Sequence, residues 1–540
     1  MESPILSTQQ RPNVIGINIG NAYSSVAIIE LDGRANVIAN EDGERMIPTT
    51  VAFSGDEEFS GSQAQGQAVR KPQKYSLRAD SEIFKTHQKT YPFTFIEKNG
   101  FAGYEVEFNG KPTQFTAHEI TAKFIKSLKD TASAYLGTEV SGAVLAVPEF
   151  FTDAQRDDLM TAARDAGLNV LQVINEPTAA VSAYDIIEGK NKKTDKTVVV
   201  LDLGARSLDV NLLSAKKGLY TVLATIHDNT IGGVKFDQLL VDHFSKEFQK
   251  KTKVDISSNT KALTKLTNAC DLTKRTLTSL ITAPCFVESL AEGLDFHSTI
   301  NRTRFEIMSA KLFNQVLSVV SALLEKSDYK SYEIDEVVLV GGASRIPKLG
   351  RKLSELFEHE DFEVRSQLET DEVIPLGCVL QAATLSQLNH GEDVSLEQLQ
   401  ENSHLINANY TVAPIGLVGG DDQFVTLIGK DTPLPVRRVF PLAIAEGSKS
   451  AFVSIYEAVE DSKTIQPETP PQDPEDDEEP EVPEPITTFF YKANTLLAEL
   501  GLKDLDTPNL QLQIEVDEQG KLDITLSDLK SGSFSQVTSA

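Results

Sequence analysis

Apolar residues recur with two different spacings over the first three quarters of the chain. In residues 119–135 and 310–324 they return at intervals of three and four, which predicts amphipathic helices. Residues 198–203 and 337–340 are short, dense apolar runs that end beside glycine, a pattern typical of buried strands entering turns. Because such strands and helices alternate from residue 14 to about residue 388, this part of the chain predicts an α/β domain.

The pattern changes after residue 390. The 540 residues are too many for a single core, so two or three domains are expected. We predict a first domain at 13–390, a polar interdomain linker at 391–409 and a small all-β domain at 410–535.

Short segments of the all-β domain alternate apolar and polar residues. Residues 424–428 and 452–456 predict strands of this kind, half buried in a sheet. Residues 510–516 and 521–526 are joined through a glycine and predict a β-hairpin. One further segment, 488–500, predicts a short helix.

An acidic tract interrupts this domain at 467–485. It holds seven prolines and nine acidic residues in nineteen positions. Such a composition cannot bury enough apolar surface to fold, so we predict a disordered, extended insertion. A docking segment for a basic partner is the alternative interpretation of the same charge run.

The composition predicts the cellular compartment of the protein and argues against a membrane span. No run of about 18 apolar residues occurs, so no transmembrane helix is expected. The first twelve residues are polar and lack a secretory core or an arginine-rich transit pattern. The three cysteines are widely spaced and odd in number, which predicts reduced thiols and a cytoplasmic protein.

The net charge of −28 concerns the partners of the protein. It repels phosphate backbones at long range, so extensive direct binding to nucleic acid is not expected. A basic protein partner is easier to accommodate, although many soluble proteins are acidic for solubility alone.

Two segments repeat one design about 180 residues apart. Residues 15–24 and 200–209 each contain an apolar strand carrying Asn18 or Asp202, then a glycine turn, then a second strand. Glycine allows backbone N–H groups to approach phosphate oxygens, and an acid on the strand can hold hydrated magnesium. One such hairpin is weak evidence for a site, but the spaced pair predicts a nucleotide clamp.

Further segments complete the pattern. Residues 174–180 place an acid at a turn into a helix, 231–237 contain a second glycine turn, and 338–347 form a strand, a Gly-Gly turn and a helix start. With residues 147–151, 270–277 and 292–296 as well, the chain resembles the seventy-kilodalton heat-shock chaperone family. The resemblance is strong over 14–390 and weaker over 410–535.

This resemblance implies the fold and the site. The implied fold is an actin-like, ribonuclease-H-like duplicated, two-lobed ATP-binding domain, followed by a β-sandwich substrate-binding-like domain. The implied cofactor is ATP with Mg²⁺, which Glu176 and Asp202 would hold through water. The residues implied to bind the nucleotide are Gly20, Asn21, Ala22, Tyr23, Glu176, Asp202, Gly204, Ala205, Arg206, Gly232, Gly233, Asp271, Lys274, Arg275, Thr278, Gly341, Gly342, Arg345 and Asp371.

The sequence departs from the family at the groups that carry the chemistry. Asn18 replaces an acid on the first strand, and Ala22 replaces a threonine hydroxyl near the γ-phosphate. Ala205 and Arg206 replace glycines of the second turn, and would be strained by about 1–2 kcal/mol if the backbone there needs positive φ.

The segment that bears the family's catalytic lysine is also missing. The interval over residues 71–93 is several residues shorter, and Lys74, Lys85 and Lys89 lack the expected surroundings. Because phosphoryl transfer depends on positioning and charge stabilisation, these losses predict ATP binding with very weak or absent hydrolysis. We therefore predict no catalytic residue.

Coupling between the two domains is altered as well. The interval at 399–406 is far more polar than the family's linker, so Pro148 and Arg156, which match relay residues, would have no linker to signal to. The chain ends soon after Leu529, which predicts a β-sandwich without a helical lid.

Within the family, the chain is most similar to the atypical chaperone subunit of the fungal ribosome-associated complex. This implies a stable heterodimer with a zuotin-like J-domain protein, indirect contact with the cytoplasmic ribosome, and activation of a second, active chaperone that folds nascent chains. The alternatives are an active ATP-hydrolysing chaperone and a nucleotide-exchange factor. The exchange factors carry long C-terminal helices that this chain lacks.

Overall fold

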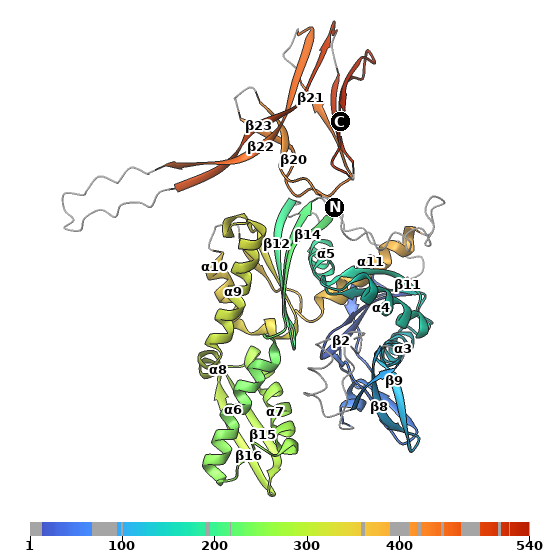
Figure 1. Cartoon of the computed structure of the whole chain (residues 1–540), viewed down its shortest axis with the longest axis vertical. Coiled ribbons are helices and arrows are strands. Elements are labelled where there is room, and N and C mark those ends of the chain that lie inside the picture. The colour runs from blue at the N-terminus through green and yellow to red at the C-terminus, as the bar shows by residue number, and fades with distance from the viewer. Residues whose placement is uncertain are drawn as a thin grey trace, which may run out of the picture. The chain divides into compact units, whose positions relative to one another are not determined.

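The protein, described here by a computed structural model, divides into two compact units, residues 1–404 and 405–540 (Figure 1). The boundary falls within the predicted linker 391–409, which lies outside the described residues. The acidic tract 467–485 and Lys74, Lys85 and Lys89 lie outside them too. The structure describes residues 13–66, 94–98, 101–188, 195–216, 218–357, 362–388, 410–419, 423–443, 448–465, 486–505, 509–517 and 519–538.

The first lobe of unit 1 is built on a mixed sheet of order β11-β10-β1-β2-β3, with β4 paired to β2. β1 runs parallel to β10 and antiparallel to β2, so the β1–β2 turn lies where β10 also ends. The elements of this lobe are β1 (Val14–Ile19), β2 (Tyr23–Ile29), β3 (Ala35–Val37), β4 (Ile47–Pro48), β5 (Val51–Ser54), β6 (Glu57–Ser60), α1 (Gly61–Gly66), β7 (Thr94–Lys98), β8 (Phe101–Phe108), β9 (Lys111–Thr116), α3 (Ala117–Leu136), β10 (Gly142–Val147), α4 (Asp153–Asp165) and β11 (Val170–Asn175).

The second lobe repeats this plan in a sheet of order β14-β13-β12-β17-β18. β12 runs antiparallel to β13 and parallel to β17, as β1 does to β2 and β10. Its elements are β12 (Asp195–Leu203), β13 (Leu208–Lys216), β14 (Leu219–Asp228), α6 (Gly233–Thr252), α7 (Thr260–Ser279), β15 (Thr282–Ala291), β16 (Leu294–Asn301), α8 (Arg302–Met308), α9 (Ala310–Ser327), η1 (Ser331–Glu333), β17 (Glu336–Val340), η2 (Gly342–Arg345), α10 (Pro347–Leu356) and β18 (Glu363–Arg365).

Two helices, α5 (Glu176–Glu188) and α11 (Val373–Leu388), join the lobes. One buried apolar cluster includes residues of both helices and of both sheets, so the helices fill the space where the lobes meet. They cross closely, because a Cβ atom added at Gly377 of α11 would lie 1.9 Å from the carbonyl oxygen of Ala179. Unit 1 is therefore the predicted duplicated, actin-like two-lobed domain.

The predicted helices and strands of unit 1 are confirmed. The predicted helix 119–135 is α3, which begins with a capping box in which the Thr116 side chain and the Glu119 backbone N–H are bonded. The predicted helix 310–324 is α9, and the two apolar runs are β12 and β17. Cys270, Cys285 and Cys378 are free and buried, as expected for reduced thiols.

His118, on α3, bridges two carboxylates of α4. Its Nδ1 lies 2.8 Å from Asp158 and its Nε2 lies 2.9 Å from Asp165. Burial lowers the pKa of His118, but the hydrogen bonds to Asp165 and Asp158 outweigh it, so the net pKa is raised. A raised pKa means that the folded protein binds the proton more tightly than the unfolded chain.

We expect His118→Gln to lose stability in a pH-dependent way. The stabilisation by His118 is fully present below the unfolded pKa of about 6.5 and disappears as pH rises through the higher folded value. Since the pair is partly exposed, the loss at pH 5.5 should stay below about 1 kcal/mol and vanish near pH 8.5. Calorimetric melts at both pH values test this, with exposed His297 changed to glutamine as the control. A pH-independent loss would contradict the assignment.

Unit 2 is a β-sandwich of two four-stranded sheets, of order β20-β19-β22-β23 and β21-β24-β25-β26. Both sheets contribute buried residues to one core, among them Ile455, Leu500, Leu512 and Ile524. The strands are β19 (Ile415–Val418), β20 (Phe424–Ile428), β21 (Val436–Leu442), β22 (Ser450–Ile465), β23 (Ile486–Lys503), β24 (Leu510–Val516), β25 (Leu522–Asp528) and β26 (Phe534–Thr538).

One prediction in unit 2 was wrong. The segment 488–500, predicted as a helix, belongs to strand β23, which pairs antiparallel with β22 along nearly its whole length. Its β-branched and aromatic residues favour a strand, and the long partner strand outweighs the apolar spacing. The predicted strands 424–428 and 452–456 and the predicted hairpin at β24–β25 are confirmed. Figure 1 shows β22 and β23 as a ribbon that continues past the rest of the sandwich.

No single helix within the described ranges is long and apolar enough to cross a membrane. The bent pair α8 and α9 satisfies the requirement by length and composition alone, and its apolar side chains, such as Phe305, Phe313 and Val320, lie in the core of the second lobe.

Candidate functional site

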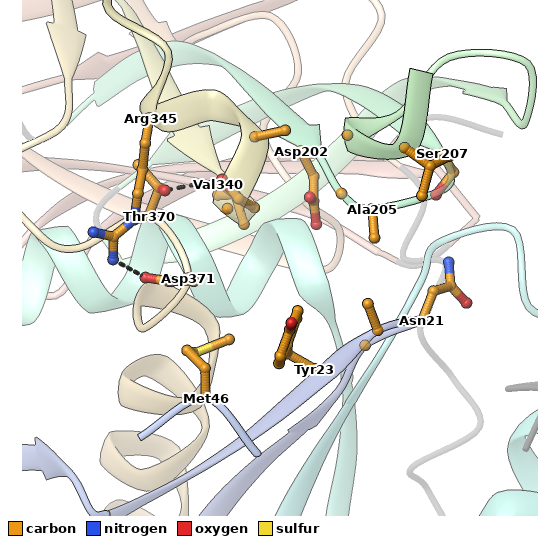
Figure 2. Close-up of a pocket in the computed structure, with 18 of the residues that line it drawn as sticks. Asn21, Tyr23, Met46, Asp202, Ala205, Ser207, Val340, Arg345, Thr370 and Asp371 are labelled. Atoms are coloured by element: carbon orange, nitrogen blue, oxygen red, sulfur yellow. Dashed lines mark hydrogen bonds and ion pairs between the residues drawn. The ribbon is translucent and has the colours of Figure 1, made fainter. Parts of the chain in front are cut away.

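A cavity of about 470 Å³ opens in unit 1 and is lined by both lobes. One wall comes from the β1–β2 turn of the first lobe, and the facing walls come from the β12–β13 turn, α7 and η2 of the second. Figure 2 shows Asp202 and Ala205 on one wall, with Tyr23 and Asn21 on the opposite side. The predicted site residues that line the cavity are Gly20, Asn21, Ala22, Tyr23, Glu176, Asp202, Gly204, Ala205, Gly233, Asp271, Lys274, Arg275, Thr278, Gly341, Gly342, Arg345 and Asp371.

Two predicted residues, Arg206 and Gly232, are not among the lining residues. Gly232 packs behind the second turn, where an added Cβ would lie 2.7 Å from the Ala205 carbonyl oxygen. Its φ of 176° is extended backbone, so close approach rather than conformation requires glycine there. Whether the lining residues bind a nucleotide stays a prediction.

The two glycine turns have the same backbone geometry. The Gly20 N–H donates to the Tyr23 carbonyl at 3.0 Å, and the Gly204 N–H donates to the Ser207 carbonyl at 3.0 Å. The internal repeat in the sequence therefore corresponds to a structural repeat. Neither Ala205 nor Arg206 has positive φ, so the strain considered for these non-glycine residues does not arise.

Gly341 leaves room for the Asp202 carboxylate. It has a φ of +82°, and an added Cβ would lie 2.4 Å from Asp202 Oδ1 and 2.6 Å from the Leu203 carbonyl oxygen. Its own carbonyl accepts a hydrogen bond from Thr370 Oγ1 at 2.9 Å (Figure 2). Only glycine combines this conformation with this contact, so the turn at Gly341 allows the Asp202 carboxylate to lie against its backbone at the cavity wall.

The cavity offers oxygen ligands suited to a hydrated cation. Asp202 and Glu176 line it, and Glu176, the first residue of α5, is 8% exposed. Asn18 Oδ1, also in the lining, is buried and has no hydrogen-bond partner among the described residues. Because a buried acceptor without a partner is costly, this atom fits a site whose remaining donor is a ligand or its water. The residues present thus fit hydrated magnesium beside a phosphate.

An ion-pair cluster forms another part of the cavity wall. Lys274 lies 2.8 Å from Asp237 and 3.0 Å from Asp271, and Arg275 lies 2.9 Å from Asp271. The Arg275 guanidinium also stacks over the Tyr23 ring of the first lobe, 4.6 Å from its centroid. Burial raises the pKa of Asp271, but the charges of Lys274 and Arg275 outweigh it, so its pKa is lowered. Burial raises the pKa of Asp237.

Arg345, the last residue of η2, also forms part of the cavity wall. It is paired with Asp371 and lies 2.7 Å from Glu369 (Figure 2). Planar cations at a cavity wall, each held in place by carboxylates, present a flat surface on which an aromatic base can stack. Met46 lies on the same side of the cavity as Tyr23 and adds an apolar contact.

Several lining residues were missed by the sequence reasoning. Asp209, Ser207 and Asp237 lie within segments singled out above, on β13, in the β12–β13 turn and on α6, and the sequence pattern did not reveal which residues of these segments face the cavity. Phe150 lies within the segment 147–151 that carries part of the family resemblance, whereas Met46 lies in a loop to which no motif pointed.

The predicted relay residues, Pro148 and Arg156, are connected to the cavity lining. Arg156 donates to Asn175 Oδ1 at 2.7 Å and to the Phe151 carbonyl oxygen at 3.2 Å, and Asn175 is also bonded to Glu149. Asn175 directly precedes Glu176, and Pro148 lines the cavity. The first helix turn of α5 is therefore held by the loop that follows β10.

A model of the Hsp70 protein family matches residues 14–416. The chain belongs to the Hsp70 family. A heat shock protein 70 homolog of Schizosaccharomyces pombe is 35% identical over 539 residues, which cover 95% of this chain and 93% of that protein.

Other Hsp70 relatives carry a more specific name. One protein of Eremothecium gossypii and one of Saccharomyces cerevisiae are each named a ribosome-associated molecular chaperone. The first is 35% identical and the second 34% identical, and each match covers 97% of this chain and 81% of the relative. Hsp70 proteins bind adenine nucleotides with magnesium, and all residues that line the cavity lie within the range that the family model matches.

Proposed function

We propose that this Hsp70 protein binds ATP with magnesium, hydrolyses it very weakly or not at all, and serves a ribosome-associated complex as a regulatory subunit. The observation that carries the proposal is the composition of the cavity at the two glycine turns. Asn18 and Ala22 line it where the family resemblance expects an acid and a hydroxyl. Magnesium, when bound, would offset phosphate charge, and Asp202 and Glu176 would orient its waters.

The residues expected on the adenosine side support nucleotide binding more strongly than they support ATP hydrolysis. The Lys274, Arg275 and Arg345 side chains are each held by carboxylates, as a preformed recognition surface requires. Turnover needs groups that stabilise charge developing in the transition state, and one missing group of that kind commonly lowers the rate by about 10²–10³. Affinity is thus expected to survive where hydrolysis does not.

The proposed assembly rests on the relatives and on charge. Relatives named ribosome-associated chaperones align with nearly all of this chain, and its net charge of −28 favours a partner that makes the contact with ribosomal RNA. We propose that this partner is a zuotin-like J-domain protein in a stable heterodimer, and that the pair activates a second chaperone on nascent chains in the cytoplasm. Isolation of the chain from cells should recover both the J-protein and ribosomes; recovery of neither would contradict the assembly.

A second candidate is an active, ATP-hydrolysing chaperone. It is favoured by the relatives named molecular chaperones, which are about one third identical along 97% of the chain. The two candidates differ in one observable, the rate at which bound ATP becomes ADP, and a single-turnover assay separates them.

We expect the β-sandwich to hold a segment of the J-protein. Its described strands expose large apolar side chains, including Phe452 at 69% and Val425 at 45%, which extended peptides can contact beside a strand edge. Hydrogen exchange of the whole chain with and without the J-protein should reveal protection in strands such as β20 and also in unit 1, because a second contact raises the effective concentration. An intact complex with an unprotected sandwich would place the partner elsewhere.

A further inference from the structure

The phosphate end of the cavity is acidic. Three carboxylates, Glu176, Asp202 and Asp209, line the cavity near the two glycine turns. The lysine and arginine side chains of the described lining all come from α7 and η2: Lys274, Arg275 and Arg345. Magnesium would offset part of the charge of a bound triphosphate, and a further cation beside the acidic wall would add to that effect.

His227 lies directly behind this acidic wall. It is the cross-strand neighbour of Asp209 in the β13–β14 register, and its Nδ1 lies 2.7 Å from Asp209 Oδ1. The other oxygen of Asp209 accepts a hydrogen bond from Ser207 Oγ at 3.1 Å. The imidazole packs against Phe150, with ring centroids 4.0 Å apart. Since Asp209 and Phe150, which contact the imidazole, both line the cavity, the imidazole is one hydrogen bond away from it.

The other charged groups around His227 are engaged elsewhere. Asp228 accepts hydrogen bonds from the N–H and hydroxyl of Thr230 at 2.7 and 2.6 Å. Lys326 of α9 donates to the Thr225 carbonyl oxygen at 3.0 Å, two residues along β14. Glu149, beside Phe150, is bonded to Asn175, and burial raises its pKa. Asp209 is therefore the acid that pairs with His227 in the described structure.

We propose that His227 is the internal cation of the phosphate end: nucleotide binding draws a proton onto its imidazole, and the imidazolium, held by Asp209, offsets part of the phosphate charge. This inference rests on the proposed nucleotide binding. A nearby anion favours the charged form of histidine, and histidine changes charge near neutral pH. Binding that takes up a proton weakens as the pH rises.

The test is calorimetry of ATP with magnesium on the whole chain near pH 7, in two buffers with different heats of ionisation. The native chain should take up a fraction of a proton per nucleotide. His227→Gln, which keeps a donor for Asp209, should take up almost none and bind about tenfold more weakly at pH 6, while binding like the native chain at pH 8.5. His118→Gln is the matched control, because His118 also pairs with aspartates, Asp158 and Asp165, but neither of them lines the cavity.

Each outcome decides the question. Equal proton uptake by the native chain and His227→Gln would overturn the inference and leave nucleotide binding intact. No ATP binding by the native chain would instead remove the proposed function. If circular dichroism finds the variant unfolded, the imidazole of His227 in the native chain can be titrated by nuclear magnetic resonance. Its midpoint must move to higher pH when nucleotide is added, and an unchanged midpoint overturns the inference.

Discussion

Gly377→Ala is expected to destabilise unit 1 by about 3 kcal/mol, the upper end of the usual cost of overpacking. The added Cβ would lie 1.9 Å from the Ala179 carbonyl oxygen and 2.6 Å from its carbonyl carbon. Both are backbone atoms of α5, so no side chain can rotate away and the two helices must separate. Since α5 carries Glu176 into the cavity, ATP affinity should fall along with stability.

Gly350→Ala is the matched control for this variant. Gly350 is also helical, in α10, and an added Cβ would meet nothing within 4 Å. There alanine should stabilise the helix by about 0.5–1 kcal/mol. Differential scanning calorimetry of both variants measures the shift of the unit 1 transition. An unchanged transition for Gly377→Ala would show that α5 and α11 do not pack as described.

Gly341→Ala is expected to abolish ATP binding, with affinity at least about 100-fold weaker. Alanine at a φ of +82° costs about 1–2 kcal/mol, and its Cβ would displace the Asp202 carboxylate from its place 2.4 Å away. The expected loss combines backbone strain with the misplacement of a residue proposed to orient the waters of magnesium.

Gly342→Ala is the control for the backbone strain expected in Gly341→Ala. An alanine Cβ at Gly342 would meet nothing within 4 Å in the protein itself, so Gly342→Ala should melt like the native chain without nucleotide, whereas Gly341→Ala should melt earlier. Melting and calorimetric titration with ATP are both needed. Native affinity in Gly341→Ala would mean that Asp202 has no part in binding.

The sequence predicted much of this site because the site is built from repeated local geometry. The hairpins around Asn18 and Asp202 could be recognised as a pair, and both close through the same Gly N–H to carbonyl hydrogen bond. The pattern could not show which side of the turn a residue faces. The family resemblance implied that Arg206 and Gly232 bind the nucleotide; neither is in the described lining, and Gly232 packs against the backbone of the second turn.

Features that depend on strand register could not be predicted. His227 and Asp209 are eighteen residues apart and come together only because β13 and β14 pair with one particular register. The wrong helix at 488–500 has the same origin, since the apolar spacing of that segment is compatible with either structure. The segment forms a strand because it pairs with β22, which precedes the acidic tract in the sequence.

The central claim is that ATP is bound but not turned over. It is tested most directly by mixing the purified chain in excess with ATP and magnesium, confirming by calorimetry that the nucleotide is bound, and following ADP through a single turnover. An active Hsp70 protein measured in parallel sets the time scale. We expect bound ATP to persist, with hydrolysis at least about 100-fold slower than in the active relative, because groups at the phosphate end are missing. Complete conversion to ADP by the chain alone, on the time scale of the active relative, would contradict the account.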